Sequence, residues 1–154
     1  MERKDAKPYY DLVNSLEYLS GVREMFSYVN EKGYTSVIIS ASSIDVTRRV
    51  KNDYDVPYIF ANELVIKDGK VSGEFHWPIG AGKENKAKII RGLSSRLNIS
   101  QNGIFYIGDS DTDIEAFKQV GTSIAFNSSS DTLKKVATFV VDSDNLADVI
   151  KYLP

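Results

Sequence analysis

The sequence predicts an α/β protein with a mostly parallel sheet, and three observations support this class. Short apolar segments typical of strands alternate with segments of helical spacing along most of the 154 residues. The strand segments are apolar almost throughout, as expected where helices cover both faces of a parallel sheet. An Asp-Gly pair at 68–69 lies between two alternating apolar segments, which indicates one β-hairpin as an excursion from that sheet.

The first half of the chain is expected to hold three helices and four strands. Leu12, Leu16 and Leu19 have the spacing of a short helix, and a longer apolar face follows from Val22. A β-branched run ends in serines, of which Ser42 or Ser43 can cap the next helix. The expected helices cover 12–19, 22–32 and 44–51, and the expected strands cover 36–39, 58–60, 64–66 and 71–73.

The second half repeats the alternation of strand and helix. A helix is expected from about Glu84, with an apolar face that includes Ala87 and Ile90. The expected strands cover 104–107, 123–126 and 139–141, and the later helices cover 131–136 and 145–152. We therefore expect one core domain over residues 1–154, a length that suits a single domain with a full core.

Bulk composition excludes several classes of function. Lys and Arg total 19 against 21 Asp and Glu, a balance that does not favour nucleic acid or an anionic membrane as partner. Cysteine is absent, which excludes disulfides, a thiolate nucleophile and zinc–thiolate sites. No apolar run approaches the roughly 18 residues of a membrane span, and the N-terminus has no signal-peptide pattern. A cytoplasmic protein is the expectation.

A run of acids marks the most informative stretch. The apolar segment 104–107 stops at Gly108, and Asp109, Asp111 and Asp113 follow at alternate positions. Carboxylates at the end of a strand in an open α/β sheet are placed for an active site, and Mg²⁺ is the cation that such oxygen ligands suit. The alternative is that these residues only cap a helix, although capping needs one such residue and not a run.

Other polar residues also follow strand segments. Ser40 offers a hydroxyl and nearby backbone N–H groups that suit a phosphate oxygen, or it only caps the next helix. Asn127, Ser128 and Ser129 end a later strand. Several lysines surround the helix start near Glu84, where one could supply a fixed positive charge or all could be solvated. The single histidine, His76, has no recognisable partner and is expected to be packed or at the surface. The lysines in question are Lys83, Lys86 and Lys88.

These residues, in this order, resemble motifs II, III and IV of the haloacid dehalogenase superfamily of phosphotransferases. The matching parts are Ser40 after a strand, a lysine that leads a helix, and Gly108-Asp109-x-x-x-Asp113. The phrase Phe60-Ala61-Asn62-Glu63, with the hairpin after it, is similar to the phosphoserine phosphatase branch. The resemblance covers most of the chain and implies the three-layer α/β sandwich of that family.

The resemblance also implies a role for each matching residue. Ser40 and Ala41 would bind the phosphate, and Lys86 would be the catalytic lysine that neutralises phosphate and nucleophile. Lys86 fits the family's spacing to the acidic turn better than Lys83. Asp109 would ligate Mg²⁺, and Asp113 would ligate it or orient its water. In the family an aspartate attacks phosphorus, and a second acid two residues on protonates the leaving alcohol.

The chain departs from the family in its first motif. The chain has no DxDxT sequence, which in the family carries the nucleophile on the first central strand. Most of the helical cap is missing as well, and residues 1–16 resemble its last remnant. Ala41-Ser42 replaces a Gly-Gly pair and Thr112 replaces Asn, which leaves the substrate open. Without the central strand, the strands near Val37 and Ile104 would expose edges that favour self-association or a complementing N-terminal fragment.

Three hypotheses remain open at this point. The first is a Mg²⁺-dependent phosphatase that acts on a small phosphorylated metabolite, with phosphoserine as the candidate, and whose nucleophile-bearing segment is absent from this chain. The second is one subunit of a two-chain phosphatase. The third is a non-catalytic module that binds metal and phosphate. In all three cases the chain alone is expected to be nearly inactive, because it has the charge-stabilising groups without the nucleophile.

Overall fold

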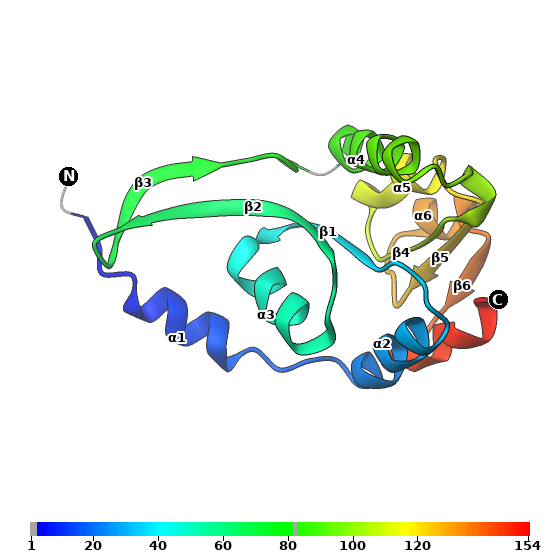
Figure 1. Ribbon diagram of the computed structural model, residues 1–154, viewed down its shortest axis with the longest axis horizontal. Helices are drawn as coiled ribbons and strands as arrows, with labels where there is room; N and C mark the ends of the chain where they lie inside the picture. The colour runs from blue at the N-terminus through cyan, green and yellow to red at the C-terminus, as the bar shows by residue number, and fades with distance from the viewer. Residues whose placement is uncertain (1–2, 82) are drawn as a thin grey trace. The chain divides into compact units, whose positions relative to one another are not determined.

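A computed structural model describes residues 3–81 and 83–154 (Figure 1). Helices and strands alternate along it as the sequence predicts. The chain divides into two compact units: the first holds the described residues up to Tyr18 with Val29–Gly80, and the second holds Leu19–Tyr28 with the described residues from Ala81 to Pro154. The helix α2 (Val22–Glu31) contributes to both units. No helix in the described ranges is long and apolar enough to cross a membrane.

The first unit contains a three-stranded sheet with the order β1-β2-β3. β1 and β2 are parallel, whereas β2 and β3 form the predicted antiparallel hairpin (Figure 1). Asp68 and Gly69 at its turn both have positive φ, 52° and 71°, as a two-residue hairpin turn of type I′ requires. The elements of this unit are α1 (Lys7–Ser15), β1 (Val37–Ser43), α3 (Ile44–Tyr54), β2 (Tyr58–Lys67) and β3 (Lys70–His76).

Several boundaries in the first unit differ from the expectation, and those of α1 and β2 differ most. α1 begins near Pro8, which suits a first helical turn, and ends before Leu16. Leu12 is 61% exposed, so the leucine spacing does not mark a buried helix face. β2 is one continuous strand where the sequence suggested two, because Ala61 and Asn62 still pair with β1 and Glu63 already pairs with β3.

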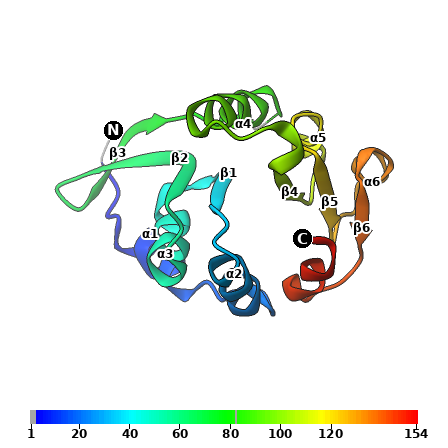
Figure 2. The ribbon, with the colours of Figure 1, turned by 45° about the vertical axis from the view of Figure 1, so that its right-hand side comes forward.

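The second unit contains a parallel sheet with the order β4-β5-β6, and Figure 2 shows these strands side by side. A core cluster of Phe117, Ala125 and Leu133 packs with Tyr106 and Ile114. The C-terminal segment is a 3₁₀ helix, not the predicted α-helix. The elements are α4 (Lys83–Leu97), η1 (Gln101–Gly103), β4 (Phe105–Gly108), η2 (Asp111–Asp113), α5 (Ile114–Phe117), β5 (Thr122–Phe126), α6 (Asp131–Val136), β6 (Phe139–Val141) and η3 (Leu146–Tyr152).

The strands form two sheets of three strands each and not one continuous sheet. β1 ends the first sheet and β4 ends the second, so each has one edge without a partner strand within the described residues. These are the two strands, near Val37 and Ile104, whose edges the sequence resemblance predicts to be exposed for lack of a central strand. The predicted architecture of parallel strands, helical connections and one hairpin is confirmed.

Candidate functional site

The acidic turn begins where β4 ends at Gly108. A Cβ atom at this position would lie 2.6 Å from Cγ of Asp113, which is closer than real Cβ atoms come to other heavy atoms. Glycine is therefore required here for a close approach, not for its backbone angle. Because Gly108 carries no side chain, the chain can fold back so that the Asp113 carboxylate lies against the end of the strand.

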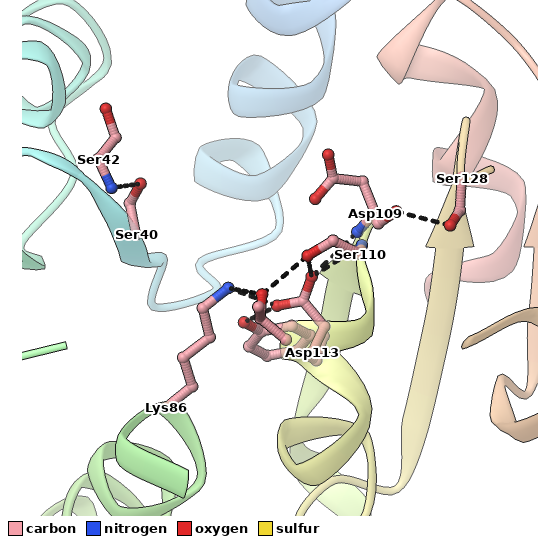
Figure 3. A network of polar contacts seen from close by, with 9 residues as sticks. Ser40, Ser42, Lys86, Asp109, Ser110, Asp113 and Ser128 are labelled. Atoms are coloured by element: carbon pink, nitrogen blue, oxygen red, sulfur yellow. Dashed lines mark hydrogen bonds and ion pairs between the residues drawn. The ribbon is translucent and has the colours of Figure 1, made fainter. Parts of the chain in front are cut away.

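Asp113 is the centre of the polar network in Figure 3. Its side chain is 3% exposed, and Oδ1 accepts hydrogen bonds from Lys86 Nζ at 2.7 Å and from Tyr106 Oη at 2.9 Å. Oδ2 accepts from the backbone N–H groups of Asp109 at 3.1 Å and Ser110 at 3.2 Å. A carboxylate has about four lone-pair sites, so these four bonds, with Ser110 Oγ also 3.5 Å from Oδ2, occupy its accepting capacity.

Lys86 is the lysine that the fold buries among those around the start of α4. Its side chain is 8% exposed, and Nζ also donates to Thr112 Oγ1 at 3.3 Å. An ammonium group has three N–H donors, so one remains for a further acceptor. Lys83 and Lys88 are exposed. The solvated alternative therefore holds for those two lysines and not for Lys86.

Asp109 has a fixed backbone and a free side chain. Its N–H donates to Asp113, and its carbonyl oxygen accepts from Ser128 Oγ at 2.6 Å. The residue is exposed, and no hydrogen bond or ion pair engages its carboxylate within the described ranges. Figure 3 shows this carboxylate apart from the hydrogen-bonded network around Asp113. Such a group can accept a ligand without first losing a protein contact.

Sequence reasoning missed two contributors to this network. Tyr106 reads as an ordinary strand residue, yet burial above all, and then the charge of Asp113, raise the pKa of its phenol, which keeps it protonated as a donor. The sequence places Ser128 among the polar residues that end a strand, but it indicates no role for this side chain. It is 5% exposed and joins the end of β5 to the acidic turn.

The donor set limits which metal could bind the acidic turn. Among the described residues there is no group of three or more His, Cys, Asp or Glu side chains placed to hold a metal ion. Asp113 has its oxygens engaged, and Asp111 Oδ1 accepts a hydrogen bond from Ser130 Oγ. This leaves the Asp109 carboxylate as the one in this turn without a protein partner among the described residues. That set fits Mg²⁺, which keeps several waters and uses one or two carboxylates. It does not fit zinc, which needs three or four protein ligands.

Ser40 and Ala41 lie within β1, in the first unit, because the strand continues to Ser43 and does not stop before Ser40 as the sequence suggested. The ladder shifts register between Ser40 and Ser43, so the two residues between them form a bulge. Ser43 caps α3 by accepting the Asp45 N–H at 3.2 Å. Ser40 therefore does not serve as the cap of that helix.

The structure brings Lys86, Asp109 and Asp113 together within the second unit. That Ser40 and Ala41 share a site with them stays a prediction. His76 is at the surface, as one alternative expected, with its side chain 69% exposed and Nδ1 2.9 Å from Glu63 Oε2.

Comparisons with known proteins agree with the motif pattern. A family model described as haloacid dehalogenase-like hydrolase matches residues 23–153. A phosphoserine phosphatase of Methanocaldococcus jannaschii is 28% identical over 134 residues, which cover 86% of this chain and 62% of that protein. A phosphoserine phosphatase of Archaeoglobus fulgidus is 28% identical over 142 residues, 92% of this chain and 41% of that protein. This chain thus spans less than two thirds of either relative.

Solved structures show the same fold. A substrate-bound phosphoserine phosphatase complex matches with a TM-score of 0.91 at 23% identity, over 99% of this chain and 72% of that one. A cobalt-bound deoxy-D-mannose-octulosonate 8-phosphate phosphatase from Haemophilus influenzae matches with a TM-score of 0.61 at 18% identity, over 80% of this chain and 61% of that one. The predicted fold, that of the haloacid dehalogenase family, is confirmed.

Proposed function

The chain belongs to the haloacid dehalogenase-like hydrolase family, and we propose that it supplies the metal-binding and phosphate-binding half of a phosphatase active site. The proposed substrate is a small phosphomonoester, with phosphoserine as the candidate because the curated relatives carry that name. One observation carries the proposal. A buried lysine with a spare N–H donor and a turn with one free carboxylate are held by the same aspartate, Asp113.

Each residue of this network has a distinct proposed role. Lys86 binds a phosphate oxygen with its remaining N–H, and its charge stabilises the negative transferring group. Asp109 ligates Mg²⁺, which when bound would supply further positive charge to the phosphate. Asp113 was expected to ligate the metal or orient its water. We assign it the positioning role, because its lone pairs already hold Lys86, Tyr106 and the turn backbone.

The attacking carboxylate is proposed to come from outside these 154 residues. No DxDxT sequence occurs in the chain, and the aspartates of the acidic turn do not form one. Of these, Asp109 has the proposed metal role and Asp113 the positioning role. We therefore expect the chain to bind Mg²⁺ and phosphate while turning over no phosphomonoester by itself. A cytoplasmic location stays a prediction. The absence of nucleic-acid and membrane partners is also a prediction, which the net charge of −2 supports.

Binding measurements on the 154-residue chain test the proposal. Isothermal calorimetry with inorganic phosphate, in buffer containing Mg²⁺, is compared for wild type, Lys86→Met and the control Lys88→Met. Lys88 carries the same charge on the same helix but is exposed. Loss of a hydrogen bond to a charged group predicts roughly tenfold weaker phosphate binding for Lys86→Met, and little change for Lys88→Met.

The metal part of the proposal has its own variants. Asp109→Asn is expected to lose Mg²⁺ affinity, whereas Asp111→Asn, which removes the same charge from the same turn, loses less. Equal losses in the two variants would contradict a ligand role for Asp109. Mg²⁺-dependent hydrolysis of phosphoserine by the purified chain, abolished by Asp109→Asn, would overturn the claim that the nucleophile lies elsewhere.

A further inference from the structure

Asn62 lies on β2 at the point where β1 leaves the regular ladder. Ser40 pairs with Ala61 and Ser43 pairs with Asn62, so Ala41 and Ser42 bulge out between the paired positions. A bulge removes ladder hydrogen bonds, and the backbone groups that it frees need other partners. Asn62 is 8% exposed, so its side-chain amide is buried beside the bulge and can be a partner for the backbone groups that the bulge frees.

The Asn62 side chain is fully hydrogen bonded. Nδ2 donates to the carbonyl oxygens of Ala41 at 2.9 Å and Gly80 at 3.2 Å. Oδ1 accepts from the backbone N–H groups of Ile79 at 3.1 Å and Gly80 at 3.1 Å. Two carbonyls facing the nitrogen and two N–H groups facing the oxygen fix the orientation of the amide, since rotating it by half a turn would mismatch all four contacts.

The contact with Ala41 determines the environment of Ser40. The peptide between Ala41 and Ser42 is held at both ends: its carbonyl accepts from Asn62, and its N–H donates to Ser40 Oγ at 3.0 Å (Figure 3). Ser40 Oγ therefore uses a lone pair as acceptor. Its own hydrogen has no acceptor among residues 3–81 and 83–154, so the hydroxyl remains available as a donor.

We propose that Asn62 is a positioning residue for phosphate binding, which acts through the Ala41–Ser42 peptide to present the Ser40 hydroxyl as a hydrogen-bond donor. This inference rests on the proposed function, to which it adds the role that the family resemblance implies for Ser40, the binding of phosphate. A phosphate dianion offers only acceptors, so a serine contributes to its binding only when the O–H points outward. By holding the Ala41 carbonyl, Asn62 keeps the Ser42 N–H on Ser40 Oγ, which leaves that orientation for the O–H.

Asn62 also anchors Ile79 and Gly80, so its removal will lower stability whatever its role at Ser40. Stability alone therefore cannot test the proposal. The positioning role makes a further claim: the effect of Asn62 on phosphate affinity passes through the Ser40 hydroxyl. A double-mutant cycle between the two residues measures that dependence directly.

The experiment uses the 154-residue chain and calorimetric titration with inorganic phosphate in the presence of Mg²⁺. Wild type is compared with Ser40→Ala, Asn62→Ala, the double variant, and Asn52→Ala as a control at an exposed asparagine of α3. Each single variant is expected to bind phosphate roughly tenfold more weakly, as for loss of a hydrogen bond to a charged group. The double variant is expected to lie within about twofold of Ser40→Ala, and Asn52→Ala within about twofold of wild type.

The outcomes separate this inference from the proposed function. If wild type binds no phosphate, the proposed function fails and the inference fails with it. If wild type binds phosphate and Ser40→Ala binds it weakly, but the Asn62→Ala loss is absent or adds fully to that of Ser40→Ala, only the role of Asn62 is overturned. Circular dichroism checks that every variant is folded.

A measurement on the wild-type chain covers the case in which Asn62→Ala does not fold. Nuclear magnetic resonance follows the Asn62 side-chain amide and the Ser42 backbone amide during a phosphate titration. Both signals are expected to shift together with that of Ser40 at one affinity. A shift at Ser40 with the Asn62 and Ser42 signals unmoved would overturn the proposed coupling.

Discussion

Replacing Asp113 with Asn is expected to be among the most destabilising single changes in the second unit. The substitution preserves size and removes the charge that balances Lys86, whose side chain is 8% exposed. It also places an amide nitrogen against N–H groups. If Asn Oδ1 keeps Lys86 and Tyr106, then Nδ2 faces the backbone donors of Asp109 and Ser110, and the reverse orientation turns Nδ2 toward Lys86.

The size of the effect follows from burial. Removing one partner of a buried ion pair costs about 3–5 kcal/mol, because the remaining charge is left unpaired away from water. Lys86→Met is a milder change. Asp113 would keep Tyr106 Oη and two backbone N–H groups as donors. We expect that variant to lose about 1–2 kcal/mol, close to the loss of one charged hydrogen bond.

Native-state hydrogen exchange measures these losses within each unit. Amides of β5 report on the second unit, and amides of β2 serve as an internal comparison in the first. At about 1.4 kcal/mol per tenfold, Asp113→Asn predicts β5 exchange faster by roughly 10²- to 4 × 10³-fold. The double variant Lys86→Met/Asp113→Asn should lose less than the sum of the single variants, since no charge is then left unpaired.

Two results would refute this reasoning. The first is a loss below about 1 kcal/mol for Asp113→Asn, which would mean that the network contributes no more than an exposed ion pair. The second is a larger loss for Lys86→Met than for Asp113→Asn. That order would make the lysine, not the aspartate, the centre of the network.

Two further predictions concern other parts of the chain. Burial raises the pKa of Tyr9 to about 12, so the neutral phenol stabilises the fold below the unfolded pKa of about 10, and that contribution is lost as pH rises through about 12. Thermal melts between pH 9 and 12 should show a fall in stability that is less steep in Tyr9→Phe, and equal slopes would contradict the assignment. Gly108→Ala should cost about 1–3 kcal/mol in urea unfolding, because its Cβ would overlap Asp113, whereas Gly92→Ala, which meets no atom within 4 Å, should be neutral or stabilising. A Gly108→Ala variant as stable as Gly92→Ala would refute the steric argument.

Much of the second unit could be predicted from sequence because its signals are local. The helix at 131–136 and the strand at 139–141 have the predicted bounds, since capping residues and short apolar runs define them. The acidic turn was found for the same reason. The buried lysine of the site was harder to predict from helical spacing. Lys83 lies four residues before Ala87 and Lys86 lies four residues before Ile90, so both lysines share a helix face with an apolar residue. The resemblance selected Lys86, and its burial agrees.

What could not be predicted depends on contacts distant in sequence. The part of Tyr106 that matters is its hydroxyl, and strand periodicity says nothing of where that hydroxyl finds a partner. The bulge at Ala41 is supported by Asn62, 21 residues away, so nothing local marks it. The leucine spacing at 12–19 failed for a related reason. Periodicity predicts a helix face only where another element covers it, and Leu12 is exposed.

The hydrogen bonds that fill the accepting capacity of Asp113 order the acidic turn during folding, before any ligand binds. Lys86 and the backbone from Asp109 to Ser110 are immobilised by bonds within the protein, so their conformational entropy is lost during folding. Immobilising one flexible side chain at a binding site costs about 0.5–1.5 kcal/mol. A ligand that meets this turn does not bear that cost for the lysine, and only the Asp109 carboxylate remains to be ordered. The turn is preorganised, so an anion or a cation can bind to it without a rearrangement of the folded chain.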